Sequence, residues 1–299
     1  MSTTTLPHSP PLALNHSVTW STLFILMWSS GYVAGKVGLP YAGPLTLIFI
    51  RFAIAAGVLL TIALFTKAPW PQDFKSIRNL AIVGFFIQAM QFSGLYVGLR
   101  HGVSAGISAL IVGLMPVLTA AGAAAFLGET VTRKQMAGLG LGIIGVATVV
   151  AHKISLDKGS AIGYAAVATA LIGITIGTLF QKKHCVGMDL RTGGVIQLTT
   201  ATLVVGPMAW FSEHFAVQWS LELIGASVWL SLVNSIGAIS VLFIMMRRGQ
   251  ASQVASLFYL VPGVTALMGY VVLHETLNAA QILGFAISAS GVYLTTRSK

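Results

Sequence analysis

The segments GLMPVLTA (113–120) and YLVPGVTA (259–266) carry a proline and a threonine in the same register, and they lie 146 residues apart. The same shift aligns LGETVTRKQMAG (127–138) with LHETLNAAQILG (273–284). The matched pairs are Pro116 and Pro262, Thr119 and Thr265, Glu129 and Glu275, and Gln135 and Gln281. Chance matches between apolar segments involve mostly leucine and alanine, so these pairs predict a chain made of two homologous halves.

The composition predicts that both halves lie in a membrane. Of the 299 residues, 56% are hydrophobic and 8% are charged, whereas a soluble domain carries about 25% charged residues. Ten apolar runs are long enough to cross a hydrocarbon core as helices. The runs cover residues 19–38, 44–66, 78–99, 104–126, 134–151, 160–180, 192–212, 222–246, 251–273 and 278–296. We therefore expect an all-α membrane protein with ten transmembrane helices.

Five spans per half is an odd number, so the second half is expected to be inverted relative to the first. The charges agree, because Arg133 and Lys134 in one loop correspond to Ala279 and Ala280 in the other half. With the N-terminus in the cytoplasm, twelve Lys and Arg residues fall in inner segments and three in outer loops. This positive-inside bias predicts that both termini are cytoplasmic.

The expected organisation is a disordered cytoplasmic tail at 1–18, a first five-helix repeat at 19–151 and a second, inverted repeat at 160–296. The tail contains no Lys or Arg, so it lacks the basic start of a secretory signal. Because one chain supplies both halves of a carrier, a monomer is expected to be sufficient for function.

A longer pattern of single residues in the first half points to a known family. It consists of Trp28, Gly31, Lys36, Pro44, Arg51, Phe52, Leu99, Arg100, Pro116, Gly128, Glu129, Thr130, Gln135 and Gly138. This pattern resembles the EamA family of the drug/metabolite transporter superfamily, over residues 20–296. The second half has Ile174 and Gln197 in place of the tryptophan and the arginine, but it keeps the proline, His-Glu-Thr, glutamine and glycine elements. The resemblance implies a ten-helix exporter of small metabolites or drugs, whose cargo ranges from amino acids to nucleotide sugars across the family.

Other classes of protein fit the sequence less well. The net charge is +10, but the basic residues stand singly or in pairs between apolar runs, so no nucleic-acid partner is expected. The sequence has no Walker motif, and the His274-Glu275 pair lacks the second histidine of a zinc-protease motif. We expect no enzyme, no catalytic residues, no cofactor and no metal site. All seven acidic residues fall in loops or at helix ends, which favours facilitated diffusion, exchange or weakly coupled export.

Polar residues inside the spans are the first candidates for binding cargo. Arg51 either braces the first two spans or binds cargo, and its shallow expected depth favours bracing. Gln88 and Gln91 lie close together in the third span, and Asn234 is the repeat counterpart of Gln88. These amides either coordinate a zwitterion or polar drug, or form hydrogen bonds between helices.

Aromatic residues and one lysine complete the expected cargo site. Trp28, Tyr32, Tyr96 and Tyr259 are candidates for the cavity wall, with packing as the alternative for each. Lys36, near the outer end of the first span, is either an end anchor or a ligand for an anionic group, and the anchor is slightly favoured.

Two symmetric pairs are expected to have structural roles. Pro116 and Pro262 interrupt spans four and nine, which predicts either hinges or static kinks. Glu129 and Glu275 end these spans, and capping or tying the hairpins that follow is preferred over gating.

Together these features predict an exporter of the bacterial cytoplasmic membrane that works by alternating access. The expected cargo is a small metabolite, an amino acid or a similar amphipathic compound or drug. One alternative is a flippase for lipids or lipid-linked sugars. The internal duplication of this chain argues against it, because such members of the superfamily are typically half-length and paired. The other alternative is a non-transporting membrane sensor.

Overall fold

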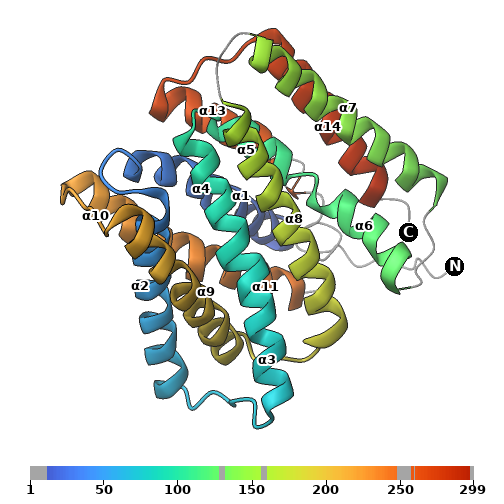
Figure 1. Cartoon of the computed structure of the whole chain (residues 1–299). Coiled ribbons are helices and arrows are strands. Elements are labelled where there is room, and N and C mark those ends of the chain that lie inside the picture. Colours follow the sequence, from blue (N-terminus) through green and yellow to red (C-terminus); the bar gives the residue numbers. More distant parts are fainter. Residues whose placement is uncertain (1–11, 128–131, 156–159, 248–256, 259, 297–299) are drawn as a thin grey trace, which may run out of the picture.

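The computed structural model describes residues 12–127, 132–155, 160–247, 257–258 and 260–296, and every regular element in these ranges is a helix (Figure 1). The first half contains α1 (Leu12–Gly38), α2 (Pro44–Phe65), α3 (Phe74–Val83), η1 (Gly84–Met90), α4 (Gln91–Arg100), α5 (Ala105–Val112), α6 (Met115–Leu127) and α7 (Arg133–Ser155). The second half contains α8 (Ala161–His184), α9 (Leu190–Glu213), α10 (Leu221–Val228), η2 (Trp229–Ala238), α11 (Ile239–Arg247), α13 (Val261–Leu273) and α14 (Ala279–Thr296).

The described helices agree with the expected all-α membrane fold. Six of them are long and apolar enough to cross a membrane, and three shorter apolar helices accompany them. The third and eighth expected spans are each built from three consecutive elements, α3–η1–α4 and α10–η2–α11. The first helix begins at Leu12, earlier than residue 19, where the first span was expected to start.

The two halves run in opposite directions, as the odd number of spans predicted. Glu213, at the end of α9, accepts hydrogen bonds from the backbone amides of Leu45 at 3.0 Å and Thr46 at 2.7 Å, in the first turn of α2. Thr192, in the first turn of α9, donates to the carbonyl oxygen of Pro69, in the segment after α2, at 2.8 Å. Repeat counterparts α2 and α9 are therefore antiparallel. We name the two ends of the bundle the Lys36 end and the Arg191 end.

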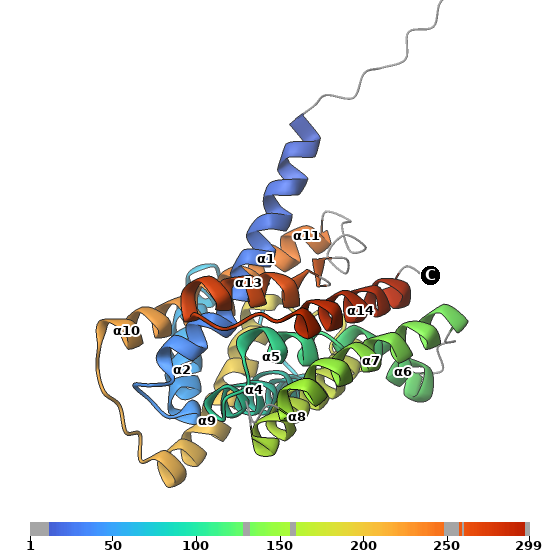
Figure 2. The same cartoon turned by 90° about the horizontal axis from the view of Figure 1, so that it is seen from above.

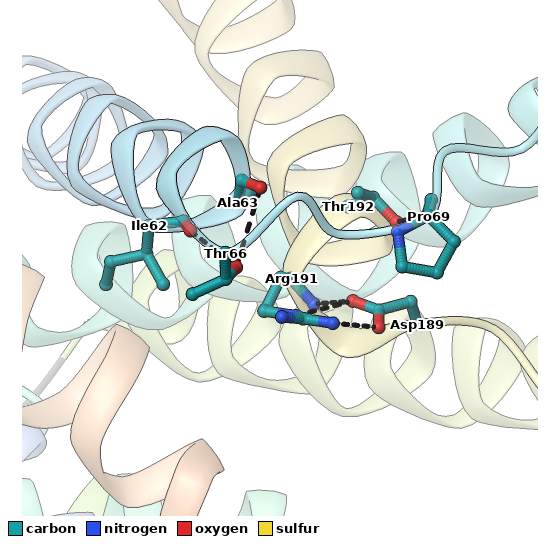
Figure 3. Close-up of polar contacts among 7 residues, drawn as sticks. All are labelled: Ile62, Ala63, Thr66, Pro69, Asp189, Arg191 and Thr192. Carbon is teal, nitrogen blue, oxygen red and sulfur yellow. Dashed lines mark hydrogen bonds and ion pairs between the residues drawn. The ribbon is translucent and has the colours of Figure 1, made fainter.

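Figure 3 shows the contacts that hold the Arg191 end together. Asp189 caps α9 by accepting from the Arg191 backbone amide at 2.9 Å, and it pairs with the Arg191 guanidinium at 2.8 Å. The hydrogen bond from the Arg191 side chain holds the pKa of the Asp189 carboxyl below its usual value. The carboxylate thus stays charged beside the helix N-terminus, where the helix dipole also favours a negative charge.

The packing between the halves is reciprocal, as a two-fold pseudosymmetry requires. Helix α1 packs against η2 and α13, and its counterpart α8 packs against η1 and α6. Two counterpart pairs, α2 with α9 and α7 with α14, pack against each other across the pseudo-two-fold axis. Figures 1 and 2 both show α7 and α14 side by side at one edge of the bundle.

Glycine permits the close approach of α7 and α14. A Cβ atom on Gly145 would lie 2.7 Å from the backbone nitrogen of Ser288, and one on Gly291 would lie 2.5 Å from the backbone nitrogen of Gly142. Gly145 and Gly291 are repeat counterparts, so the contact is made twice. Helix pairs in membranes associate through such small residues because packing between them replaces a hydrophobic driving force.

Gly145→Leu should therefore separate α7 from α14 and lower the free energy of unfolding by about 1–3 kcal/mol, the usual cost of overpacking. The control is Gly140→Leu on the same helix, where a Cβ atom would meet nothing within 4 Å. Thermal unfolding in detergent measures both variants. Equal midpoints for the two leucine variants would contradict the proposed role of the glycine contact.

Candidate functional site

A cavity of about 90 Å³ lies between the two halves, and we call it the central cavity. Its polar and aromatic lining comes from α1, α2, η1, α4 and η2. These lining residues are Trp28, Tyr32, Arg51, Gln88, Gln91, Phe92, Asn234 and Ser235. Helices far apart in the sequence thus bring six of the side chains singled out in the sequence to one place.

Two π-helical segments position the amides of this cavity. Gln88 lies in η1 and Asn234 in η2, and both side chains are buried. The two segments occupy equivalent places in the two repeats. A π-helical turn is wider than an α-helical turn and is often found at functional sites, because it turns side chains away from the regular helix face.

Arg51 is 4% exposed and makes contacts with both halves. Its Nε donates to the hydroxyl of Ser235 in η2 at 2.9 Å, and its Nη1 donates to the hydroxyl of Tyr96 in α4 at 3.0 Å. The guanidinium also lies 4.1 Å from the centre of the Phe92 ring, within cation–π range. Arg51 therefore holds elements of the two halves together, which is the bracing role, and its side chain also lines the central cavity.

The orientation of the Asn234 amide follows from its neighbours. Its Nδ2 donates to the carbonyl oxygen of Met27 at 2.5 Å. Because a carbonyl only accepts, the nitrogen must face Met27 and the oxygen must face away. Asn234 Oδ1 is buried without a hydrogen-bond partner in the described part of the chain. Gly31 makes the approach possible, since a Cβ atom there would lie 2.7 Å from Asn234 Nδ2.

A second, wider cavity of about 300 Å³ adjoins the central cavity and extends toward the Arg191 end. The two share Trp28, Ile87, Gln88, Ile174, Ser235 and Ile239. Gln197, the repeat counterpart of Arg51, lines the wide cavity together with Met188 and Leu198. No carboxylate lines either cavity among the described residues.

The Lys36 end is bridged by an ion pair between the halves. Lys36, in the last turn of α1, donates to the carboxylate of Glu275, which follows α13. Glu275 also accepts from the backbone amide of Ala105, at the start of α5, at 3.1 Å. The Glu275 carboxylate therefore contacts the first half of the chain. The sequence instead predicted that it caps or ties the hairpin of its own half. Lys36 holds an anionic group of its own chain and lines neither cavity.

The remaining candidates lie in different surroundings. Tyr96 is fully buried and positions Arg51, with no share in the lining of the central cavity. Pro116 and Pro262 are the second residues of α6 and α13, so they begin helices after a break and do not kink continuous ones. A helix needs no backbone N–H at such a position. Glu129 and Tyr259 fall outside the described residues.

Sequence reasoning missed two residues of the site. Ser235 accepts the Arg51 hydrogen bond, and Phe92 lies beneath the guanidinium. Ser235 directly follows Asn234, and Phe92 directly follows Gln91. Because an α-helical period separates adjacent residues around the helix, the sequence did not predict that they line the same cavity as their neighbours. In the structure both adjacent pairs line the cavity, Gln91 and Phe92 from the α-helix α4 and Asn234 and Ser235 from the π-helical η2.

Comparison with known proteins agrees with the repeat and the fold. The sequence profile described as the EamA-like transporter family matches residues 16–151 and 161–297. An uncharacterized transporter, YvbV, of Bacillus subtilis is 28% identical over 92% of this chain and 90% of its own. A probable amino-acid metabolite efflux pump of Salmonella typhimurium is 25% identical over 91% of this chain and 92% of its own. A crystal structure with 16% identity superposes with a TM-score of 0.67, covering 95% of this chain and 99% of the other.

Tyr96→Phe should lower the free energy of unfolding by about 1.5–3 kcal/mol, the usual value of a hydrogen bond to a charged group. The phenylalanine removes the acceptor of Arg51 and fills the same space. Tyr270→Phe is the control, because the Tyr270 side chain is more than half exposed. Chemical unfolding in detergent reports the difference. A Tyr96→Phe protein as stable as the control would show that this hydroxyl does not hold Arg51.

Proposed function

Because the chain belongs to the EamA-like transporter family of the drug/metabolite transporter superfamily, we propose that it is a secondary transporter that exports a small metabolite by alternating access. The cargo is an amino acid or a similar amphipathic compound or drug. The observation that carries this proposal is the central cavity between two inverted halves, which adjoins a wide cavity toward one end and has an ion pair across the other.

The arrangement supports a carrier that is open to one side at a time. The wide cavity runs toward the Arg191 end, while the Lys36–Glu275 pair ties the halves together at the opposite end. Inverted repeats allow the opposite state, because each half can take the conformation of its counterpart. In the exporter we propose, breaking the Lys36–Glu275 pair opens the central cavity toward the Lys36 end.

The relatives and the lining support an amino acid as cargo. Two relatives bear the name probable amino-acid metabolite efflux pump. The central cavity combines an arginine and three amides with aromatic rings, which suits a ligand with a polar head and an apolar body.

The proposed location is the cytoplasmic membrane of a bacterium, with both termini and the Arg191 end in the cytoplasm. The support is the basic residues near that end, as the positive-inside rule requires. The cavities form within one chain, which supports a functional monomer.

Proteoliposomes containing the purified protein should transport amino acids when a gradient is imposed. A mixture of the twenty standard amino acids is loaded, and mass spectrometry of the outer medium follows their release. Release of at least one above that from protein-free liposomes is expected. If no amino acid leaves, but a labelled phospholipid crosses between leaflets, the protein is a flippase; if neither moves, it is not a transporter of either kind.

Glu275→Gln should weaken the contact with Lys36 that keeps the Lys36 end closed. A cysteine at Leu95, which lines the central cavity, reports access in a Cys185→Ser background. An impermeant maleimide added outside intact cells should label it about fivefold faster in Glu275→Gln, since a partly buried ion pair is worth roughly 1 kcal/mol.

The matched control for this labelling is Glu222→Gln, which removes an exposed carboxylate from the first turn of α10. Labelling of the Leu95 cysteine should keep the parental rate in that variant. Equal rates in Glu275→Gln and Glu222→Gln would contradict a gating role for the ion pair.

A further inference from the structure

We propose that Arg51, Gln88, Gln91 and Asn234 form a binding site for the head group of a zwitterionic α-amino acid, which we call the head-group site. The carboxylate of the cargo binds Arg51, and its ammonium binds Asn234 Oδ1 and the glutamine carbonyl oxygens. The cargo side chain extends into the wide cavity. This inference rests on the proposed transport function and assigns the atoms that select the cargo.

The cationic half of the head-group site is the Arg51 guanidinium. Its described partners, Ser235 and Tyr96, are neutral hydroxyls, and they take two of its five N–H groups. No carboxylate among the described cavity-lining residues neutralises it. A guanidinium buried in a membrane protein needs an anionic or strongly polar partner. A carboxylate is a good match, because the planar guanidinium can donate two parallel hydrogen bonds to its two oxygens.

The accepting half of the head-group site is formed by amide oxygens. Asn234 Oδ1 is buried and has no partner in the described part of the chain, while its nitrogen is held by Met27. The side chains of Gln88 and Gln91 are buried at the same cavity, and neither makes a hydrogen bond to a described residue. Leaving the buried Asn234 oxygen unpaired is costly, so it is suited to a ligand that donates hydrogen bonds, and the two glutamine amides line the same cavity. An ammonium group donates three.

The difference between the two halves orients the cargo. Arg51 in the first half corresponds to Gln197 in the second, and Gln197 lies in the wide cavity toward the Arg191 end. Only the central cavity therefore has an intramembrane cation among the described lining residues. The wide cavity offers apolar walls, including Leu59, Leu198 and Leu242. A zwitterion thus binds with its head in the central cavity, and a cation lacking a carboxylate is repelled by Arg51.

Four leucine-shaped solutes test the head-group site in proteoliposomes. L-leucine is the zwitterion, L-leucinamide and isoamylamine are cations without a carboxylate, and 4-methylpentanoate lacks the ammonium. The three analogues are loaded together with the twenty amino acids used above, which already include L-leucine. The wild-type protein should release L-leucine in preference to all three analogues.

Arg51→Gln should lower the ratio of L-leucine to L-leucinamide release about tenfold, as expected for the loss of a hydrogen-bonded charge. Arg51→Lys should restore part of this ratio, because it retains the positive charge. Asn234→Leu should instead lower the ratio of L-leucine to 4-methylpentanoate release. Tyr270→Phe, at an exposed position, should leave both ratios unchanged.

The ratios of solute release distinguish a defect in binding from a defect in folding, because misfolding lowers the protein-dependent release of all solutes by the same factor. The inference is overturned if wild-type protein releases isoamylamine or L-leucinamide as fast as L-leucine, or if Arg51→Gln lowers all four solutes equally, in which case Arg51 is only a brace. In both cases transport itself still stands. If none of the amino acids or analogues is released, the proposed function fails as well.

Discussion

A charge buried inside a membrane protein needs partners there, and in this chain groups from both halves supply part of what Arg51 requires. Ser235 belongs to η2 and Tyr96 to α4, and the serine hydroxyl of Ser231 also donates to the Arg51 backbone carbonyl at 3.0 Å. The guanidinium therefore can be buried only when the halves are assembled. The same assembly forms the cavity whose wall it occupies, so stability depends on the side chain to which we also assign cargo recognition.

The fold could be predicted from the sequence because its determinants are periodic and repeated. Apolar length marks the spans, and the shift between Pro116 and Pro262 marks the duplication. The direction of the second half follows from the count of spans. Helix starts are less accurate, as Leu12 shows, because polar residues can continue a helix beyond an apolar run. The sequence predicts that Pro116 and Pro262 form hinges or kinks, but a residue without an N–H is equally suited to the first turn of a helix, where the structure places both.

The site could be predicted only in part, because residue type suggests a polar group and packing decides its partners. Gln88 and Asn234 were named from their intramembrane position and repeat symmetry, and Trp28 as an aromatic candidate for the cavity wall; all three line one cavity. The pairing of Lys36 with Glu275 joins residues 239 positions apart, which no local pattern encodes. The π-helical segments also escaped prediction, since their hydrogen-bond pattern depends on neighbouring helices more than on apolar periodicity.

The unequal pair of Arg51 and Gln197 has a consequence for how such a carrier evolves. An antiparallel homodimer of single repeats would place two guanidiniums at its interface or none, because symmetry copies every substitution. Joining the repeats in one chain removes that restriction, so one half can acquire a charge while the other remains neutral. Joining two repeats in one chain thereby permits the asymmetric head-group site that we propose, which a symmetric dimer of identical repeats cannot encode.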